Sequence, residues 1–509
     1  MEAEMTNDFA ADVLICGAGA AGLTLAIEFA RRGVSFRLID RLNAPFHGSR
    51  GKGIQPRTQE IFEDLGILDK AVAAGGLYPR QRTYRDDGSY SDADMGEIIQ
   101  PTPAEPYHLA LMVPQFITEQ ILRSRLAELG GRVEFGLELK GFEQDEDGVT
   151  AFVAHNEREE IIRARWLIGA DGGKSFVRRS LGIGFPGSTL DARAVVADVE
   201  LSGLSREVAH RFARGGDMSL QIWIGPLAGT DLFQIQGPVA QEAHVDLTPA
   251  GLTKFVSERT GQSDVVVRAV YWASDYEMNA RLADSYRSGR AFLVGDAAHV
   301  HPPTGGQGLN TSVQDAYNLG WKLSAVLRGA PVRLLDSYEA ERRPVAATML
   351  GLASRLLDAQ KQGEMRRGRD VRQLDIDYPV SGLSLNCTAT QPSVPAGTRA
   401  PDAPLRGAGG QITRVFDLLK GPHWTLLAYE FPKQTVKSRA GLHVHRIGSD
   451  GEFFDAWQHF KDAYSLMPGE CVLVRPDGYV GAVFDAERDE DIESYLAGVN
   501  LTSLQEERR

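Results

Sequence analysis

The chain has 509 residues, of which 43% are apolar and 24% charged, a composition typical of globular proteins and not of disordered or fibrous ones. This length is too great for one compact core, so two to four domains are expected. The net charge of −13 argues against nucleic acid or an anionic membrane as a main partner.

Neither a targeting segment nor a disulfide scaffold is predicted. The acidic N-terminus (Glu2, Glu4, Asp8) lacks the basic region of a signal peptide, and the uncharged stretch 13–27 is too short to span a membrane. The cysteines Cys16, Cys387 and Cys471 lie far apart in the sequence and form no C-x-x-C pair. We therefore expect neither disulfides nor a structural zinc site. A cytoplasmic location is therefore expected.

A β–α–β unit is predicted at the N-terminus. Residues 11–16 have the pattern of a buried parallel strand, residues 23–30 that of a helix, and residues 34–39 that of a second strand. The turn between the first strand and the helix follows the G-x-G-x-x-G pattern, through Gly17, Gly19, Ala21 and Gly22. Asp40 ends the second strand, where an acid can bind ribose hydroxyls, and Arg41 is expected beside an adenine. The unit predicts a dinucleotide site.

A sheet is predicted in the middle of the chain. Residues 218–224 alternate between two faces, residues 232–236 return after a turn at 229–231, and residues 265–272 form another candidate strand. Strand position alone suggests four substrate-pocket residues: Gln221, Trp223, Phe233 and Tyr271. The alternative is that all four are ordinary core residues.

The most informative stretch is residues 291–310. An apolar strand at 291–294 leads to Asp296, prolines at 302 and 303 stiffen a turn, and glycines at 305, 306 and 308 allow backbone to approach a flat ligand. A long helix is predicted to follow, with Thr311 and Gln314 as a capping box. The N-terminus of that helix can stabilise an anion.

His299 and His301 have the H-x-H spacing of some metal ligands. No acid or further histidine completes a coordination set, so no metal is expected, and a structural role for His299 is preferred.

The C-terminal part is predicted to be a separate α/β unit. Prolines at 392, 395, 401 and 404 indicate a linker into it. Strands are expected at 424–430 and 442–447, helices at 454–464 and from about 489, and a hairpin turn at 475–478.

The segment 291–310, together with the N-terminal fingerprint, resembles the flavin-binding motifs of the class A FAD-dependent aromatic monooxygenases, typified by para-hydroxybenzoate hydroxylase. Asp171-Gly172, after a predicted strand at 166–169, is similar to that family's Asp-Gly motif. The run 472–478 resembles the terminal thioredoxin-like domain of the larger phenol, polyketide and rifamycin hydroxylases, without its C-x-x-C pair. The resemblance covers nearly the whole chain.

The resemblance implies FAD as cofactor, NADPH or NADH as co-substrate, and hydroxylation of a phenolic or polyketide-like aromatic compound by O2 through a flavin C4a-hydroperoxide. It also implies roles for individual residues. Arg50 would lie beside the flavin ring, Gln115 and Asp296 on the ribityl chain, Asp171 near the pyrophosphate, and Pro303 at the reactive edge. The backbone that would meet the isoalloxazine ring belongs to Gly306, Gly308, Leu309 and Asn310. Of these residues, Arg50 and Pro303 are the candidates for a catalytic part.

The fold implied is α/β: a Rossmann-like FAD/NAD(P)-binding domain, an inserted β-sheet substrate domain and a C-terminal thioredoxin-like domain. The expected boundaries are 1–190 and 285–375 for the FAD domain, with parts of the substrate domain near 75–110, then 191–284 for the substrate sheet, 376–395 for a linker and 396–509 for the last domain.

Three alternatives stay open. A FAD-dependent reductase or dehydrogenase could act on a non-aromatic substrate, and a FAD-binding protein could be catalytically inactive. A flavin halogenase shares the fold, but Trp223-Ile224-Gly225-Pro226 is only a faint echo of the W-x-W-x-I-P motif. The base that would ionise a phenol, the substrate's identity and the oligomeric state, with a homodimer as one option, are not determined by the sequence.

Overall fold

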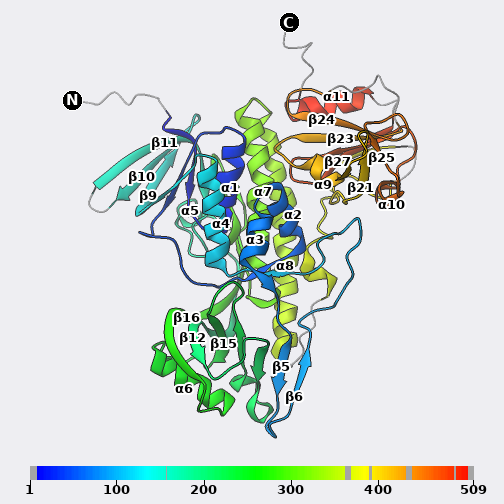
Figure 1. Ribbon diagram of the computed structural model, residues 1–509. Coiled ribbons are helices and arrows are strands. Elements are labelled where there is room, and N and C mark those ends of the chain that lie inside the picture. The colour runs from blue at the N-terminus through cyan, green and yellow to red at the C-terminus, as the bar shows by residue number, and fades with distance from the viewer. Residues whose placement is uncertain are drawn as a thin grey trace, which may run out of the picture.

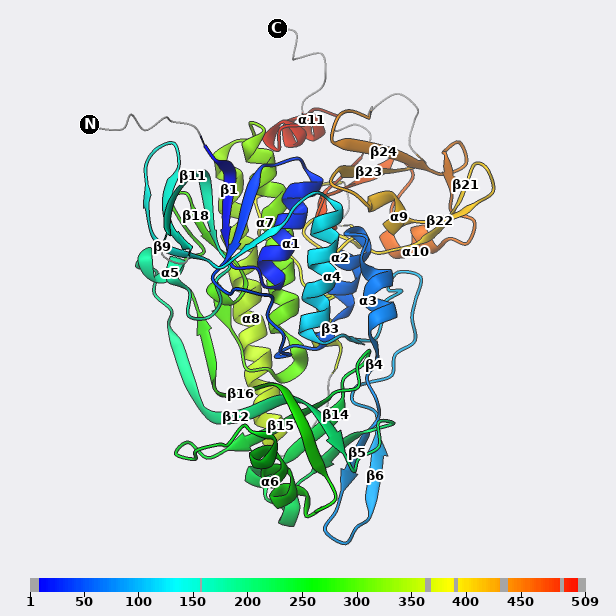
Figure 2. The same cartoon turned by 60° about the vertical axis from the view of Figure 1, so that its left-hand side comes forward.

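The computed structural model describes residues 9–155, 158–361, 368–388, 392–430, 438–485 and 489–501. The acidic N-terminal residues discussed above and residues 389–391 of the expected linker lie outside these ranges. Figures 1 and 2 show three bodies: a sheet flanked by long helices at the upper left, a second sheet below it, and a C-terminal unit at the upper right. Within the described ranges, every helix is too short or too polar to span a lipid bilayer.

The first body is built on a mostly parallel sheet. β1 pairs in parallel with β2 and β11, and β11 pairs in parallel with β18. The strands in spatial order are β17 (Arg287–Ser288), β18 (Ala291–Leu293), β11 (Arg158–Gly169), β1 (Ala11–Cys16), β2 (Phe36–Asp40) and β8 (Val133–Phe135), and β9 (Leu137–Gln144) and β10 (Val149–His155) extend β11. The strands predicted at 11–16, 34–39 and 291–294 are confirmed within a few residues, and the one predicted at 166–169 is the end of a longer strand that begins at Arg158.

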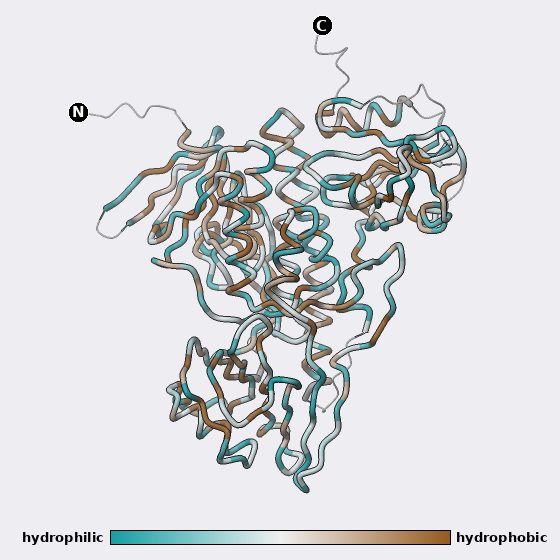
Figure 3. The backbone as a smooth tube through the Cα atoms, viewed as in Figure 1, coloured by the Kyte–Doolittle hydropathy of each residue, from teal (hydrophilic) through white to brown (hydrophobic). Residues whose placement is uncertain are grey.

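Helices surround this sheet and bury its apolar strands. They are α1 (Ala20–Arg31), α2 (Pro56–Asp64), α3 (Leu68–Ala74), α4 (Gln115–Glu128), α5 (Phe176–Ser180), α7 (Gly308–Leu327) and α8 (Asp336–Lys361). α1 packs against both α4 and α7. Figure 3 shows apolar segments gathered in this upper part of the molecule. A small sheet of β3 (Gly53–Ile54), β7 (Leu111–Met112) and β4 (Gly76–Leu77) lies beside these helices.

Two glycines of the fingerprint are required by close packing. Gly17 has a φ of +110°, and a Cβ there would lie 2.2 Å from the carbonyl oxygen of Ala170. A Cβ on Gly22 would lie 1.9 Å from the carbonyl oxygen of Gly17. Because no side chain fits at either position, the turn brings the ends of β1 and β11 against the start of α1.

The second body is a mostly antiparallel sheet, with β13 and β5 paired in parallel, that draws strands from three regions of the chain. In spatial order these are β19 (His299–Val300), β16 (Val266–Leu282), β12 (Gly187–Ser202), β15 (Phe233–Val239), β14 (Ile222–Pro226), β13 (Ala209–Phe212), β5 (Gln81–Tyr84) and β6 (Tyr90–Ala93). α6 (Pro249–Thr260) packs on β14 and β16. α8 runs down from the first body to this sheet (Figures 1 and 2).

The strand predicted at 218–224 is only partly right. Residues Met218–Leu220 form a short 3-10 turn in which Asp217 accepts a hydrogen bond from the Ser219 amide, and the strand starts at Ile222. The strand predicted at 265–272 is longer and extends to Leu282, because it pairs with β12 along most of its length.

The third body is a mixed sheet with short helices. Its strands in order are β20 (Leu385–Cys387), β27 (Val480–Asp485), β26 (Glu470–Val474), β23 (Trp424–Tyr429), β24 (Leu442–Ile447), β25 (Phe453–Phe454), β21 (Pro404–Gly407) and β22 (Ile412–Arg414). Its helices are α9 (Val415–Leu419), α10 (His459–Tyr464) and α11 (Asp489–Gly498). The hairpin at 475–478 is confirmed. The helix expected over 454–464 is shorter, because Asp455 accepts the amides of Phe460 and Lys461 and so starts the helix late.

Buried charges join the third body to the first. Arg475 of the hairpin donates to both Glu341 carboxylate oxygens, at 2.7 and 2.8 Å, and to Asp477. Lys322 of α7 donates to Glu341 at 2.6 Å. All four side chains are almost fully buried. Because a buried charge is stable only when paired, the hairpin is held in one position against α7 and α8.

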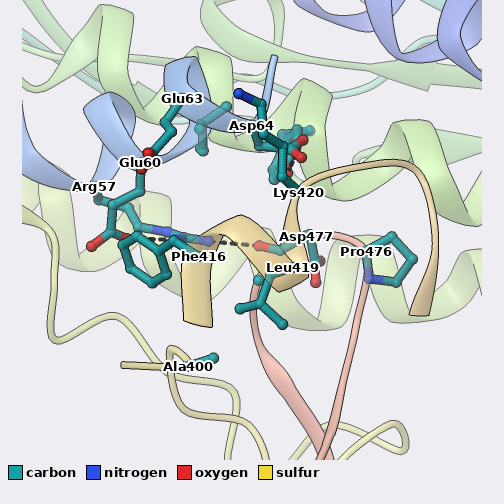
Figure 4. A pocket seen from close by; sticks show the side chains of 13 residues that line it. Arg57, Glu60, Glu63, Asp64, Ala400, Phe416, Leu419, Lys420, Pro476 and Asp477 are labelled. Carbon is teal, nitrogen blue, oxygen red and sulfur yellow. Dashed lines mark hydrogen bonds and ion pairs between the residues drawn. The ribbon is translucent and has the colours of Figure 1, made fainter. Parts of the chain in front are cut away.

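A second contact lies beside this cluster, at the junction of α2, α9 and the hairpin (Figure 4). Arg57 of α2 donates to Glu60 and to the backbone carbonyl of Asp477 at 2.6 Å. Arg399 pairs with the other oxygen of Glu60 at 2.9 Å. The first and third bodies therefore share buried ion pairs and hydrogen bonds, beside an apolar cluster that includes Trp321 and Trp424.

We expect Arg475→Met to lower the free energy of unfolding by about 3–5 kcal/mol, because Glu341 and Asp477 would stay buried with too few cations. Chemical denaturation measures the loss. Arg369→Met is the control, since Arg369 pairs with Glu105 and Asp375 but is 44% exposed, and we expect about 0–1 kcal/mol there. Equal losses for the two variants would contradict the role given to the buried cluster.

Candidate functional site

The nucleotide end of the site lies at the carboxyl ends of β1 and β2. Gly19 precedes the first turn of α1, and Ala21 is buried within that turn. Both Asp40 carboxylate oxygens accept backbone amides, one from Ala18 and one from Leu42, each at 2.8 Å. Arg41 is exposed to solvent. The acid therefore lies at the strand end as expected, and it also shapes the glycine turn.

Gln115 and Arg50 are brought together from distant parts of the chain. Gln115 is the first residue of α4, and its Oε1 accepts the backbone amides of Arg50 at 3.2 Å and Gly51 at 3.3 Å. Its Nε2 donates to Glu119 Oε1 at 2.9 Å. The Arg50 guanidinium is exposed and lies 5.6 Å from the ring centroid of Phe46. Gln115 thus fixes the loop that carries Arg50.

Glu119 is a residue that the sequence analysis missed. Glu119 is 2% exposed. A Cβ on Gly19 would lie 3.9 Å from Glu119 Oε1, so this carboxyl borders the glycine turn. Burial raises its pKa to about 7, against the lowering effects of the Gln115 hydrogen bond and of Arg123. The helical spacing of Glu119 from Gln115 is the signal that could have found it.

Asp171 has a structural role that the sequence analysis did not predict. Its Oδ2 accepts the backbone amides of Phe176 at 2.6 Å and Val177 at 3.1 Å, at the start of α5. Its Oδ1 is buried and has no hydrogen-bond partner in the described chain. A buried carboxylate oxygen without a partner is costly, which favours a ligand group on this side.

The stretch after β18 forms the centre of the site. Asp296 lies in a short 3-10 turn, Gly295–Ala297, and is exposed to solvent. The surrounding protein still raises the pKa of its carboxyl, because it removes part of the water that would solvate the charged form. Pro303 is exposed, and Gly305 and Gly306 have φ of +77° and +66°. These residues expose backbone to a space that a flat molecule could enter.

Asn310 holds this centre in place through its side chain. Its Oδ1 accepts the Gln55 amide at 2.8 Å, and its Nδ2 donates to the carbonyls of Gly53 and Gly306 at 2.8 and 2.6 Å. Gly308 starts α7, and Leu309 is half-buried. The backbone of Gly308, Leu309 and Asn310 therefore lies at the first turn of a long helix, where amides are unpaired.

The capping box predicted at Thr311 and Gln314 is wrong. α7 starts three residues before Thr311, whose hydroxyl donates back to the Gln307 carbonyl at 3.0 Å. Gln314 instead donates to Gln373. The glycine-rich turn continues directly into the helix, so no side-chain cap is needed.

His299 has the structural role that was preferred for it. Its Nε2 lies 2.6 Å from Asp315 Oδ2, and Arg342 donates to Asp315 Oδ1 at 2.8 Å; all three side chains are fully buried. His301 has both ring nitrogens buried without partners, and burial lowers its pKa to about 3. In the part of the chain that the structure describes, no group of three or more His, Cys, Asp or Glu is arranged to hold a metal.

A cavity of about 490 Å³ connects this centre to the second sheet. One wall is the loop Pro303–Gly306, a second is Arg50–Gly53, a third is the face of β14 and β15, and Leu356 and Leu357 of α8 close one side. Gln221 and Trp223, both expected from the sequence, line it.

Phe233 and Tyr271 do not line the cavity, which corrects the expected pocket set. Phe233 is 2% exposed and packs in the core between the sheet and α6. Tyr271 is 52% exposed, and its hydroxyl donates to Glu200 at 2.7 Å. Trp223 pairs with Gln236, whereas Phe233 pairs with Pro226. Pro226 is three residues from Trp223 on the same strand, so its side chain is on the opposite face of the sheet, and that of Phe233 lies with it on the core face.

The cavity also contains polar residues that the sequence analysis did not select. Lys52, Gln236 and Tyr276 line it. Burial raises the pKa of Tyr276 to about 12, so its hydroxyl remains a donor at neutral pH. The polar–apolar–polar order Gln234-Ile235-Gln236 is a signal that could have indicated the strand face.

Comparison with known proteins gives a consistent result. A family model described as FAD binding domain matches residues 10–353, and one described as aromatic-ring hydroxylase, C-terminal, matches residues 394–499. A flavin-dependent monooxygenase of Mycobacteroides abscessus is 40% identical, over 96% of this chain and 99% of its own length. A rifampicin monooxygenase of Rhodococcus hoagii is 33% identical, over 94% of this chain and 96% of its own.

Solved structures agree with these matches. One similar structure is that of a ternary complex of aklavinone-11 hydroxylase with FAD and aklavinone. The two chains are 28% identical and superpose with a TM-score of 0.82, over 97% of this chain and 99% of the hydroxylase chain. The similarity therefore extends over all three bodies, including the C-terminal one.

We expect Glu119 to contribute a decline in stability as the pH rises from about 4.5 to about 7, whereas His301, whose pKa is lowered, contributes in the opposite direction. The folded-state pKa of Glu119 lies above the ordinary value of 4.5, so the native state binds the proton more tightly and is favoured at low pH. Glu119→Gln should remove up to about 3 kcal/mol of this decline. Denaturation midpoints measured across that range test it.

Glu128→Gln, at the other end of α4, is the control. Lys70 and Arg125 lower the pKa of Glu128, so its ionised form is the favoured one in the native state. That variant should keep the wild-type decline between pH 4.5 and 7. A decline unchanged in Glu119→Gln would show that this carboxyl is not the source.

Proposed function

Because the chain belongs to the family of FAD-dependent aromatic-ring hydroxylases, we propose that it inserts one oxygen atom of O2 into a phenolic or polyketide-like aromatic substrate, with NADPH or NADH as electron donor. The observation that carries this proposal is the 490 Å³ cavity, which joins the loop Pro303–Gly306 to one face of the second sheet. Because the loop assigned to the flavin ring and the second sheet line the same cavity, it offers room for the ring together with an aromatic substrate. The relatives named for rifampicin and aklavinone support the same class of substrate.

The nucleotide half of FAD is assigned to the fingerprint. Gly17, Gly19, Ala21 and Gly22 leave room for the pyrophosphate at the N-terminus of α1, and Asp40 is assigned to the ribose, with Arg41 beside the adenine. The orphaned Asp171 Oδ1 fits a position near the pyrophosphate.

The flavin half is assigned to the centre of the site. Asp296 and Gln115 would hold the ribityl chain, and Arg50 would lie beside the ring. The ring itself would lie against Pro303, Gly306, Gly308, Leu309 and Asn310. The first turn of α7 offers amide groups and positive potential to negative charge on the ring edge.

FAD, once bound, accepts two electrons from the pyridine nucleotide and activates O2 for transfer to the substrate. The chain supplies position and a dry environment. Met218, Met278, Leu356 and Leu357 give the cavity apolar walls. Exclusion of water matters because activated oxygen is otherwise lost to hydrogen peroxide.

We propose that the domains, within the boundaries expected from the sequence, have separate binding roles. Residues 1–190 and 285–375 would bind FAD, and residues 191–284, with strands from 75–110, would bind the substrate. The pairing of β5 with β13 supports the inclusion of the 75–110 region. Residues 396–509 would act through packing, since Cys387 and Cys471 lie on separate strands, β20 and β26, and form no C-x-x-C pair.

The function is tested with purified, FAD-loaded protein. Phenols, naphthols and polycyclic polyketides are screened for faster NADPH oxidation, and the product is analysed by mass under 18O2. We expect a gain of one labelled oxygen atom. Substrate turnover with unlabelled product would indicate the alternative, a FAD-dependent reductase or dehydrogenase; an absence of any stimulation would indicate an inactive FAD-binding protein.

We expect Asp296→Ala to lose FAD during purification, because the variant lacks the acceptor assigned to the ribityl chain. Asp40→Ala should retain FAD but bind it about tenfold more weakly, the effect of one lost charge-assisted hydrogen bond. Flavin absorbance per protein and a titration of apoprotein with FAD measure both. Full occupancy in Asp296→Ala would contradict the ribityl assignment.

A further inference from the structure

A buried carboxyl group borders the turn to which the FAD pyrophosphate is assigned. Glu119 is 2% exposed and belongs to α4, which packs on α1, the helix that follows the glycine turn. None of the FAD contacts assigned above involves this group. Burial of an ionised carboxyl costs free energy unless the charge is paired, so the position of Glu119 needs a physical reason.

The open side of Gly19 shows where the carboxyl lies. Gly19 is the fingerprint glycine whose missing side chain lets a pyrophosphate approach the backbone. A Cβ at this position would have one atom of the described chain within 4 Å, apart from the chain neighbours of Gly19, and that atom is Glu119 Oε1 at 3.9 Å. Glu119 therefore lies on the side from which Gly19 is accessible, and its carboxyl borders the space assigned to the pyrophosphate.

Hydrogen bonds hold the carboxyl in this place in either protonation state. Glu119 Oε1 accepts Gln115 Nε2 at 2.9 Å, and Gln115 Oε1 in turn accepts the backbone amides of Arg50 and Gly51. The Gln115 amide is thus fixed from both ends. An oxygen of a carboxylate and the carbonyl oxygen of a carboxylic acid both accept a hydrogen bond, so Glu119 can change its protonation without a new rotamer of Gln115.

The charges that face Glu119 come from three elements. On the same helix, Arg123 Nη1 lies 3.9 Å from Glu119 Oε2, which is longer than a hydrogen bond. Arg50, on the loop after β2, favours the ionised carboxyl, whereas Asp40, at the end of β2, opposes it. Burial outweighs these charges and raises the pKa of Glu119 to about 7, so both forms are populated near neutral pH.

Among the described residues, the charges of the other helices packed on α4 lie away from Glu119. In the second half of α1, Glu28 and Arg31 pair with each other. On α3, Asp69 and Lys70 are exposed, and Lys70 pairs with Glu128 at the far end of α4. A negatively charged ligand in front of Gly19 would therefore be the main new influence on this carboxyl.

We propose that Glu119 takes up one proton from solvent when FAD binds, so that the pyrophosphate is bound beside a neutral carboxylic acid. The proton goes to the carboxylate; no covalent bond forms with FAD, and no electron is transferred. The physical reason is that a nearby like charge disfavours the ionised form of a buried carboxyl. This inference rests on the assignment of FAD to the fingerprint, and it makes Glu119 a positioning residue whose protonation sets the affinity for FAD.

Proton uptake makes the affinity for FAD depend on pH with a definite sign. The FAD-bound protein holds the proton more tightly than the FAD-free protein, so affinity is highest at low pH and falls as the pH rises through the FAD-free pKa of about 7. Each unit by which FAD raises that pKa adds about a tenfold fall in affinity. For a rise of about one to two units, the dissociation constant should increase about five- to twentyfold between about pH 6.5 and 8.5.

Isothermal titration calorimetry of the apoprotein with FAD counts the protons, because the measured heat depends on the ionisation enthalpy of the buffer. At about pH 8, in phosphate, HEPES and Tris, the wild-type protein should take up about 0.4–0.8 proton per FAD. Glu119→Gln keeps the size of the side chain and an acceptor for Gln115, and it should take up almost none. At that pH it should bind FAD about five- to tenfold more tightly than the wild-type protein, with an affinity that hardly changes with pH.

Glu128→Gln is the matched control, since Glu128 is on the same helix, its side chain is 43% exposed, and it pairs with Lys70 and Arg125. This variant should keep the proton uptake and the pH dependence of the wild-type protein. Glu119→Met, which is uncharged and of similar length, repeats the test if Glu119→Gln does not fold. Thermal midpoints of all variants identify a folding defect.

Three results would overturn the proposal. The first is wild-type protein that binds FAD without proton uptake. The second is an uptake that the Glu119 variants retain, which would indicate another carboxyl such as Asp171 or Asp40. The third is a folded Glu119→Gln that no longer binds FAD, because the ionised carboxyl would then be required.

These measurements need no substrate turnover, so they are separable from the test of the proposed function. Labelled product under 18O2, together with FAD binding without proton uptake, would leave the hydroxylase function intact and overturn the role of Glu119. Proton uptake that depends on Glu119, together with unlabelled product, would support the role of Glu119 and overturn the hydroxylase function.

Discussion

The structure depends on one helix whose buried polar side chains must all be paired. α7 is buried along most of its length, and it carries Asn310, Asp315, Asn318 and Lys322 at 2% exposure or less. An unpaired charge or amide at such positions costs more than the helix gains from packing. Each partner is therefore held in place: the loop after Gly53, the strand end at His299, and the C-terminal hairpin through Glu341 and Asp477.

This constraint explains how the functional site is assembled from distant segments. Asn310 joins the loop that carries Lys52 to the loop that carries Pro303 and Gly306, through three hydrogen bonds. Asp315 holds His299 and accepts the amide of Gly295, immediately before Asp296. The same helix whose first turn is assigned to the flavin in our proposal thus also determines the position of the cavity wall and of the third body.

The mechanism follows from what the chain supplies to FAD and to the substrate. The helix start offers positive potential, the glycine turns offer close backbone approach, and the cavity offers apolar walls with a cationic lining. The cofactor provides the oxidation chemistry, whereas the residues of the chain orient the aromatic ring and keep water away.

The sequence by itself determined the local elements and the family of motifs. Strand, glycine turn and helix at residues 11–31, and the strand and turn at 291–306, follow from hydrophobic period and from steric demands that act between near neighbours. The tertiary structure decided which polar residues meet. Thr311 and Gln314 had capping-box spacing, but their partners are Gln307 and Gln373. Phe233 had a strand position as good as Trp223, but the pairing of β14 with β15 put only Trp223 at the cavity. Tyr271, on β16, is exposed away from the cavity and donates to Glu200. Lys52 meets Gln234 across 182 residues, and no local pattern can encode such a contact, because hydrogen bonding between distant side chains depends on how whole sheets and helices pack.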